Sequence, residues 1–177
     1  LPVQSGSSRI LKLMNRGYDR EKYLQLIDDI KQRIPDCSIS MDMIIGFCSE
    51  SEQDHQDTLS LMDKVEYDFG YLFKYSVRPN TPAARMEDDI PENIKQRRLA
   101  EIIDKQQAHS LKHMKEKVGN TYEVLIEGIS KKSAQHFYGR TTYNSAVIFE
   151  KGKHKLGDYV MVKIEDCTSA TLKGKVI

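Results

Sequence analysis

The sequence lacks the features that mark several classes of protein. Its 177 residues include only three cysteines, Cys37, Cys48 and Cys167, and no two of them form a CxxC pair. Such scattered cysteines exclude a disulfide framework and favour a reducing, cytoplasmic setting. No apolar run approaches the roughly 20 residues that a membrane helix needs, and no signal-peptide pattern is present. We therefore expect no membrane partner.

Motifs for metals and for nucleotide phosphates are also missing. The five histidines are dispersed along the chain, and the three cysteines have no chelating spacing. The sequence therefore predicts no metal site formed by its own residues. It also contains no nucleophile–base signature and no glycine-rich phosphate loop.

What is present is an uneven distribution of charge. The chain carries 27 Lys+Arg and 26 Asp+Glu, a net charge of +1. Residues 1–112 hold 16 basic and 19 acidic residues, a net of −3, whereas residues 113–177 hold 11 and 7, a net of +4. This asymmetry predicts a basic module joined to a more neutral body. We place the boundary near Val118, which gives one domain over 1–117 and a second over 118–177.

The first domain alternates short apolar runs with segments of helical periodicity. Parallel strands need helical crossovers, so the order strand–helix–strand–helix–strand and then a long helix predicts an α/β fold. Three strands are too few to close a barrel, and they leave an unpaired apolar edge at the N-terminal side. Such an edge predicts part of a larger (β/α) barrel, or a homodimer formed by strand pairing. The expected elements are a strand end over 1–7, helices over 9–15, 19–34, 52–65 and 92–117, and strands over 39–47 and 70–76.

The second domain changes to the two-residue period of strands. Five short strands with glycines in or near the turns predict a small antiparallel β-barrel of the oligonucleotide-binding type. The strands are expected over 121–129, 135–142, 145–150, 158–164 and 170–177.

Basic and aromatic side chains gather near the first turn of this barrel. Cations pair with phosphates and aromatic rings stack on unpaired bases, so the segment is a candidate RNA surface. The alternative is an ordinary barrel whose aromatic residues are core and whose lysines are only solvated. The candidate RNA-binding residues are Lys131, Lys132, Phe137, Arg140, Thr141 and Asn144.

Three segments of the α/β domain are candidates for ligand binding, because ligands of α/β folds lie at the carboxyl ends of strands. The second strand ends at Gly46, which permits close backbone approach, and Glu50 follows it. Residues 5–9 offer small hydroxyl groups after a strand, and Tyr75 and Arg78 follow the third strand. The alternatives are an ordinary strand-to-helix turn, a helix cap and a surface ion pair.

Four motifs occur in a fixed order along the first domain. They are LPVQSGS at 1–7, LMNR at 13–16, DMIIGF at 42–47 and YSVRPNTPAA at 75–84. Together they resemble the radical S-adenosylmethionine methylthiotransferases. The segments SKKS at 130–133 and GRT at 139–141 resemble TRAM, the small barrel that ends proteins of that family. The resemblance extends over nearly the whole chain.

The resemblance implies an enzyme that places a methylthio group on C2 of an isopentenylated adenosine beside the tRNA anticodon. It implies S-adenosylmethionine as methyl donor and radical source, two 4Fe-4S clusters, and the anticodon stem-loop of tRNA as a partner. By motif position it implies that the cofactor is bound by Gln4, Ser5, Ile44, Gly46, Tyr75 and Arg78.

The sequence departs from this family in two places. The CxxxCxxC motif for the radical cluster and the three cysteines of a preceding domain are both absent. Without these thiolates no electron reaches S-adenosylmethionine. We therefore expect the chain to be the C-terminal part of the enzyme, inactive alone, with the cluster cysteines upstream of Leu1. After Phe47 the family has Pro-Gly, whereas this sequence has Cys48-Ser49, which weakens a role for Glu50.

Two alternatives stay open at this point. Within the family, the substrate is a threonylcarbamoyladenosine of tRNA or an aspartate of a ribosomal protein. Outside it, the chain is a non-catalytic RNA-binding module whose α/β part is only a scaffold.

Overall fold

The structure, a computed structural model, describes residues 2–177. It consists of two compact units, one up to His109 and one over Ser110–Ile177. The helix α4 (Glu92–Glu116) passes from the first unit to the second. The division between the two compact units lies within this helix, and the domain boundary near Val118 stays a prediction. The end of α4 belongs with the second unit because Met114 packs against the core of the barrel.

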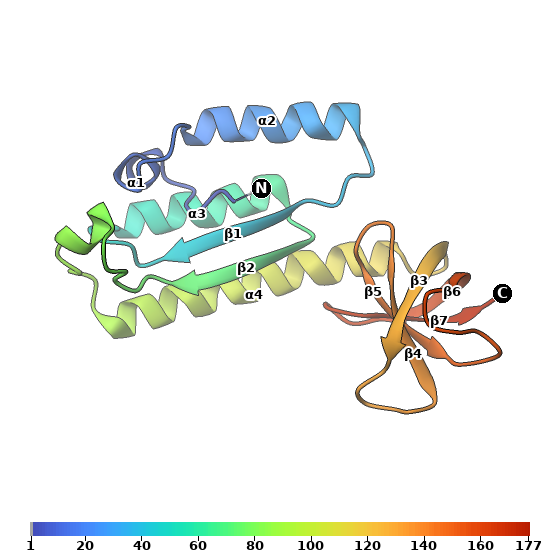
Figure 1. Cartoon of the computed structure of the whole chain (residues 1–177). Helices are drawn as coiled ribbons and strands as arrows, with labels where there is room; N and C mark the ends of the chain where they lie inside the picture. Colours follow the sequence, from blue (N-terminus) through green and yellow to red (C-terminus); the bar gives the residue numbers. More distant parts are fainter. Residues whose placement is uncertain (1) are drawn as a thin grey trace. The chain divides into compact units, whose positions relative to one another are not determined.

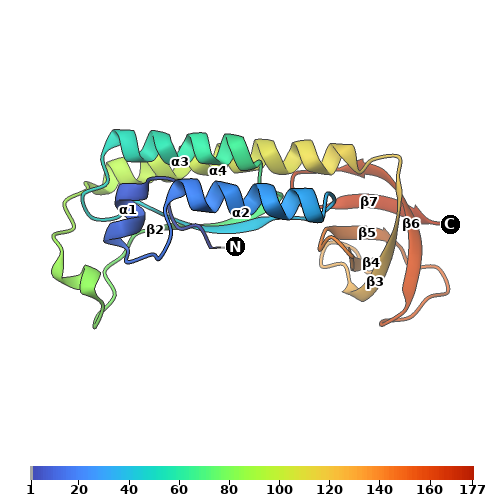
Figure 2. The same ribbon diagram turned by 90° about the horizontal axis from the view of Figure 1, so that it is seen from above.

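The first unit places its helices on one face of a two-stranded sheet (Figures 1 and 2). Strands β1 (Ser40–Ile45) and β2 (Phe69–Lys74) pair in parallel, with Ser40 opposite Phe69 and Ile45 opposite Lys74. The parallel direction follows from the crossover helix α3 (Glu52–Val65) between them. This confirms the α/β prediction. The other elements are α1 (Ser8–Leu13), α2 (Arg20–Arg33) and the short 3-10 helix η1 (Pro82–Arg85).

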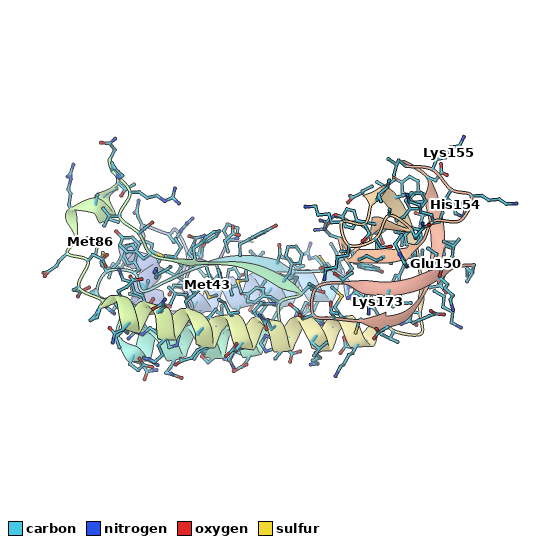
Figure 3. The ribbon with its side chains drawn as sticks, turned by 90° about the horizontal axis from the view of Figure 1, so that it is seen from below. Met43, Met86, Glu150, His154, Lys155 and Lys173 are labelled. Carbon is cyan, nitrogen blue, oxygen red and sulfur yellow. The ribbon has the colours of Figure 1, made fainter. Side chains whose placement is uncertain are left out.

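Alternation along the strands separates a covered face of the sheet from an open one. Met41, Met43 and Ile45 are at most 1% exposed, and they pack against apolar side chains of α2, α3 and α4. Figure 3 labels Met43 in this layer. On β2, Tyr71 and Phe73 are 60% and 53% exposed. One face of the sheet therefore holds the core of the unit, and the other is left open to ligands.

The strand end expected over residues 1–7 is reduced to a single parallel bridge between Gln4 and Met43. The Gln4 amide donates to the Asp42 carbonyl at 2.9 Å, and the Gln4 carbonyl accepts from the Ile44 amide at 3.0 Å. The pairing stops there because Gln4 has φ +68°, a left-handed conformation that turns the chain out of line. Leu1, the first residue of the expected strand, lies outside the described residues.

Local capping signals act as expected. The Asp19 side chain accepts from the Lys22 amide and begins α2. Ser51 and Asp54 form a complete capping box at the start of α3, each side chain accepting from the other's backbone N–H. Both helices start where the sequence predicts, because caps depend only on neighbouring residues.

The second unit is a closed five-stranded barrel with the order β3-β4-β5-β7-β6. Four of its five pairings are antiparallel, but β5 and β7 pair in parallel. The expectation of purely antiparallel pairing needs this correction. An odd number of strands cannot close with strictly alternating directions, so one pair must run in parallel. The strands are β3 (Thr121–Ile129), β4 (His136–Thr141), β5 (Ala146–Glu150), β6 (Tyr159–Cys167) and β7 (Leu172–Val176).

The barrel is filled by inward-facing side chains from all of its strands. Val124, Val147, Phe149 and Val162 are at most 1% exposed. At Gly139 a Cβ atom would lie 2.2 Å from the Leu125 carbonyl oxygen, so the close approach of β4 to β3 requires glycine there. Within residues 2–177, no helix is long and apolar enough to cross a membrane.

Candidate functional site

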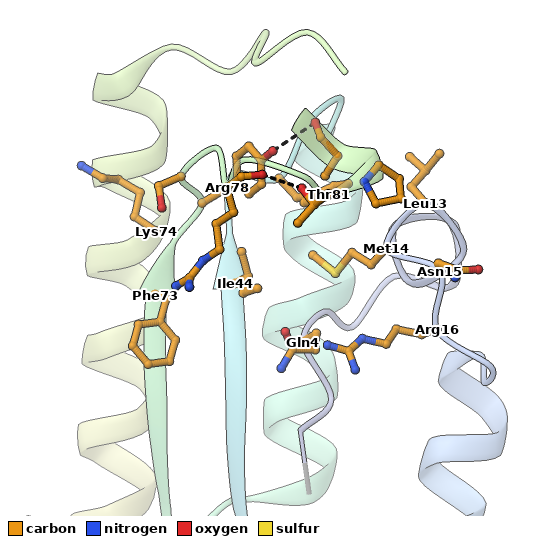
Figure 4. Close-up of a pocket in the computed structure, with 15 residues that line it drawn as sticks. Gln4, Leu13, Met14, Asn15, Arg16, Ile44, Phe73, Lys74, Arg78 and Thr81 are labelled. Carbon is orange, nitrogen blue, oxygen red and sulfur yellow. Dashed lines mark hydrogen bonds between the residues drawn. The ribbon is translucent and has the colours of Figure 1, made fainter. Parts of the chain in front are cut away.

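A cavity of about 460 Å³ lies at the carboxyl ends of β1 and β2 in the first unit (Figure 4). Ligands of α/β folds bind at this end of the sheet, and the volume is that of a small-molecule site. Its walls come from the chain at Gln4, the end of α1, the two strand ends and the loop into η1. They are formed by Gln4, Leu13, Met14, Asn15, Arg16, Ile44, Phe47, Phe73, Lys74, Tyr75, Ser76, Arg78, Thr81, Pro82 and Ala83.

Tyr75 is held firmly in the wall of this cavity. Its amide donates to the Ile45 carbonyl at 2.8 Å, and its hydroxyl donates to the Ala83 carbonyl at 3.3 Å. Its ring meets the Phe47 ring edge-on, with centroids 5.0 Å apart. Burial, reinforced by the neighbouring Cys48, raises the pKa of Tyr75 to about 12. Tyr75 is therefore a neutral, fixed wall that also ties the following loop to the sheet.

The loop after Tyr75 is closed by the cap of η1. The Thr81 hydroxyl donates to the Arg78 carbonyl at 2.8 Å and accepts from the Ala84 amide at 3.3 Å. This cap fixes the backbone that carries the exposed Arg78 side chain. In Figure 4 that side chain points from the loop toward the level of Ile44. Arg78 therefore borders the cavity, and the structure of residues 2–177 shows no ion pair for it, which was the alternative for its sequence position.

Gly46 and Glu50 form the turn beneath the cavity. The Gly46 amide donates to both Glu50 carboxylate oxygens, at 3.1 and 3.2 Å. Arg98 of α4 donates to the Glu50 carboxylate at 3.0 Å and to its carbonyl at 2.9 Å. Glu50 and Arg98 are 3% and 5% exposed, and burial raises the pKa of Glu50. The buried Glu50–Arg98 pair and the Gly46 amide thus fix this turn.

The segment after Gln4 packs against α3 and not into the cavity. The Ser5 hydroxyl accepts from the Ser7 amide at 3.2 Å, and Ser5 is 1% exposed. The Ser7 hydroxyl accepts from the Ile10 amide as the N-cap of α1 and donates to Asp54 at 2.6 Å. A Cβ on Gly6 would lie 2.4 Å from the Thr58 backbone, so glycine is required for this contact. Helix capping, the alternative for this segment, accounts for the Ser7 hydroxyl, and the Ser5 hydroxyl is occupied by the Ser7 amide.

The structure brings together four of the six predicted cofactor residues. Gln4, Ile44, Tyr75 and Arg78 line the cavity, whereas Ser5 and Gly46 support its walls from behind. Sequence reasoning missed Phe73, although the two-residue period of its strand placed it on the open face with Tyr71. It also named residues 13–16 only as part of a motif, and this segment closes one side of the cavity.

The predicted RNA residues divide into exposed and buried groups. Lys131 and Lys132 are exposed in the loop between β3 and β4. Arg140 donates to the Asn144 carbonyl and side-chain oxygen at 3.2 and 3.0 Å, and also pairs with Glu127 at 3.3 Å. The two lysines and Arg140 do not form one edge, because Lys131 and Lys132 lie in the turn of the β3–β4 hairpin and Arg140 lies at its other end, opposite Leu125.

Phe137 and Thr141 do not fit the roles that the sequence suggested. Phe137 is 6% exposed and belongs to the barrel core, with its ring centroid 6.2 Å from that of Phe149. It has no free face on which a base can stack. Thr141 is also 6% exposed, and its hydroxyl accepts from the Tyr143 and Ser145 amides within the turn. The exposed aromatic residue that sequence reasoning missed is Tyr159, at 65%.

The described residues do not fit an iron–sulfur cluster. Within residues 2–177, no three histidine, cysteine, aspartate or glutamate side chains gather closely enough to hold a metal ion. Cys48 is buried against the cavity wall, and Cys37 and Cys167 belong to different units.

Comparisons with known proteins agree with this geometry. Residues 1–62 match the model of the Radical SAM superfamily, and residues 115–177 match that of the TRAM domain. Three similar curated proteins are each named tRNA-2-methylthio-N(6)-dimethylallyladenosine synthase. They come from Christiangramia forsetii, Chloroherpeton thalassium and Flavobacterium johnsoniae, with 59%, 57% and 56% identity over 100% of this chain.

The chain spans 37–40% of the length of these relatives. Within that span it contains both matched segments in order, with the cavity in the first unit and the barrel in the second. The chain therefore contains a Radical SAM segment followed by a TRAM domain, and over its whole length it is similar to part of these tRNA-2-methylthio-N(6)-dimethylallyladenosine synthases.

Proposed function

We propose that the chain serves a cytoplasmic enzyme that adds a methylthio group to C2 of an isopentenylated adenosine beside the tRNA anticodon. The α/β unit binds S-adenosylmethionine in its cavity, and the barrel binds the anticodon stem-loop. The observation that carries this proposal is the convergence of Gln4, Ile44 and Tyr75 on one cavity at the carboxyl ends of the strands. The choice of substrate rests on the names of the curated relatives, which are tRNA-2-methylthio-N(6)-dimethylallyladenosine synthases.

The walls of the cavity suit a nucleoside joined to a charged amino acid. Ile44 and Phe47 provide apolar surface for a purine ring. Gln4 provides an amide for the polar part of the cofactor. These residues bind and orient the cofactor. The hydrogen bond from the Gly46 amide to the buried Glu50 carboxylate fixes the backbone that follows Ile44. S-adenosylmethionine and the two 4Fe-4S clusters, when bound, supply the radical chemistry.

We propose that the cysteines that bind the 4Fe-4S clusters lie outside these 177 residues and that the chain alone is inactive. The role proposed for residues 2–109 is to hold the cofactor, and that proposed for the barrel is to hold RNA.

Binding of RNA by the barrel is supported by the exposed Lys131 and Lys132 of the β3–β4 loop. Lys155 extends from the neighbouring loop before β6 (Figure 3). Asn144 has φ +59°, and its side-chain oxygen accepts from Arg140. Cations of this kind bind phosphates, and the exposed Tyr159 ring is free to stack on a base.

The test is the nucleoside composition of tRNA from a strain in which the gene is deleted. We expect mass spectrometry to show dimethylallyladenosine without its 2-methylthio group, and the intact gene to restore it. An Ile44→Asp gene is expected to fail, because a charge would replace the apolar cavity wall. The matched control is Leu26→Asp, at a site on α2 that is 45% exposed.

The result that contradicts the proposal is an unchanged methylthio content after deletion. Loss of methylthio from threonylcarbamoyladenosine or from a ribosomal aspartate instead supports the other substrates of the same family. No change in any of the three supports the non-catalytic RNA-binding module.

A further inference from the structure

Two arginines line the cavity, Arg16 and Arg78. Four of the eight arginines in the first unit are engaged; for example, Arg9 pairs with Asp54, and Arg98 pairs with Glu50. Of the other four, only Arg16 and Arg78 lie at the cavity. Within residues 2–177, no side-chain hydrogen bond or ion pair is found for Arg16 or Arg78, and both are exposed. These two exposed cations lie in a part of the chain, residues 1–112, whose net charge is −3.

The two side chains enter the cavity from opposite walls. Arg16 follows the end of α1, and Arg78 lies in the loop between β2 and η1. Figure 4 shows both pointing inward, with Ile44 and Gln4 between them. Their backbones are fixed, because the Arg16 amide donates to the Leu11 carbonyl at 2.9 Å and Thr81 holds the Arg78 carbonyl. The cations are therefore held on either side of one opening.

We propose that Arg16 and Arg78 bind the RNA phosphates that flank the nucleoside to be modified. The inference rests on the proposed function. A base that enters a cavity leaves the stack, and its 5′ and 3′ phosphates remain at the mouth on opposite sides. Guanidinium groups bind phosphate oxygens in a bidentate manner, and such contacts set position and register. Two unpaired arginines on opposite walls match two successive phosphates.

The neighbouring residues agree with this assignment. Phe73 lines the cavity and is 53% exposed, so its ring is available to stack on the extruded base. The nearby acids Asp88 and Asp89 do not neutralise the arginines. Asp88 pairs with Lys95, and Asp89 accepts from the Ser49 amide at 2.7 Å. The α/β unit therefore contributes to RNA binding, in addition to the barrel.

The experiment measures binding of a fluorescent anticodon stem-loop RNA to the full chain over a series of salt concentrations. Arg16→Ala and Arg78→Ala are each expected to reduce the slope of log Kd against log salt by about 0.7–0.9. This corresponds to roughly five- to eight-fold weaker binding at about 0.1 M salt. Arg78→Lys should keep the slope. The matched control is Arg33→Ala, which removes an exposed arginine at the end of α2, away from the cavity.

Other outcomes overturn the inference in distinguishable ways. If the rim variants keep the wild-type slope while Lys131→Ala reduces it, the barrel binds RNA and the rim does not. If the wild-type chain binds no RNA, the proposed function fails together with the inference.

A titration with S-adenosylhomocysteine and with 5′-methylthioadenosine separates the phosphate from the cofactor carboxylate. The second compound lacks the amino-acid part of the first. If the rim variants weaken only S-adenosylhomocysteine binding and leave the RNA slope unchanged, the arginines bind the cofactor carboxylate and the inference is wrong. Unchanged affinity for both compounds, with a reduced RNA slope, supports it.

Discussion

The two units of the chain differ in how the faces of their β-sheets are covered. The barrel closes its sheet completely, so every strand has two neighbours and the inner face is filled. The α/β unit covers one face of its sheet with helices and leaves Tyr71 and Phe73 of the other face exposed. Because its interior is filled, the barrel has only its outer surface available for binding. The α/β unit has a cavity at the open face of its sheet. The following predictions test this contrast.

The largest effect is expected from a cavity in the closed barrel. Phe149 is 1% exposed in the barrel core, and Phe149→Ala should destabilise that unit by about 3–5 kcal/mol. Amide hydrogen exchange should accelerate in β3–β7 and stay unchanged in β1 and β2. Ile129→Ala, at a site that is 52% exposed, is the control. Equal acceleration in both units would show that they do not unfold separately.

A buried carboxylate should make the α/β unit the more acid-sensitive of the two. Burial opposes ionisation of Asp54, but hydrogen bonds from Arg9, Ser51 and Ser7 outweigh it and hold the pKa of Asp54 well below 3.8. A folded-state pKa below the unfolded value gives stability that is present above about pH 4 and is lost as the pH falls toward the folded pKa. Asp54→Asn should therefore cost about 1.5–3 kcal/mol at pH 7 and flatten the acid dependence.

The measurement is denaturant unfolding of the α/β unit between pH 7 and pH 3. Asp166→Asn is the control in the barrel, where the pKa of Asp166 is lowered by Lys173 but the carboxylate is fully in water. It should change the barrel's stability very little. An acid profile of Asp54→Asn identical to that of the wild type would refute the assignment.

The outer surface of the barrel should contribute its own share of the charge-dependent binding of RNA. Removing both exposed lysines of the β3–β4 loop, as Lys131→Ala with Lys132→Ala, should reduce the salt slope by about 1.4–1.8. The paired control, Lys22→Ala with Lys64→Ala, removes the same charge from exposed positions on α2 and α3. Similar slopes for the two double variants would mean that only net charge matters.

The smallest effect is expected at the wall of the open site. Tyr75→Phe removes the hydrogen bond to the Ala83 carbonyl and should destabilise the α/β unit by about 0.5–1.5 kcal/mol. Since the pKa of Tyr75 is about 12, the hydroxyl is neutral at physiological pH, and the loss should not vary between pH 6 and pH 9. Thermal unfolding at both pH values measures it. A loss confined to one pH would imply that the hydroxyl titrates.

The parts of the fold that depend on neighbouring residues were predictable. Asp19 and Ser51 cap their helices as their sequence context indicates. The carboxyl ends of the parallel strands also gathered Ile44 and Tyr75 into one cavity, because parallel strands bring these ends together.

The parts that depend on distant residues were not predictable. Arg98 and Glu50 are 48 positions apart in the sequence, and no local pattern predicts that they pair. Phe137 and Tyr138 are adjacent aromatics on one strand, and the alternation alone does not say which of them faces the core. The left-handed conformation of Gln4 was likewise not predictable, because glutamine does not favour positive φ.

The parallel β5–β7 pair has a dynamic consequence for the barrel. Its register contains only two residue pairs, Val147 with Leu172 and Ile148 with Lys173, whereas the other pairings are longer. A ring of strands opens where the fewest hydrogen bonds must break, so thermal fluctuations should part the barrel along this line first. The closed barrel is thus weakest between β5 and β7, while β7 stays paired with β6 through five residue pairs.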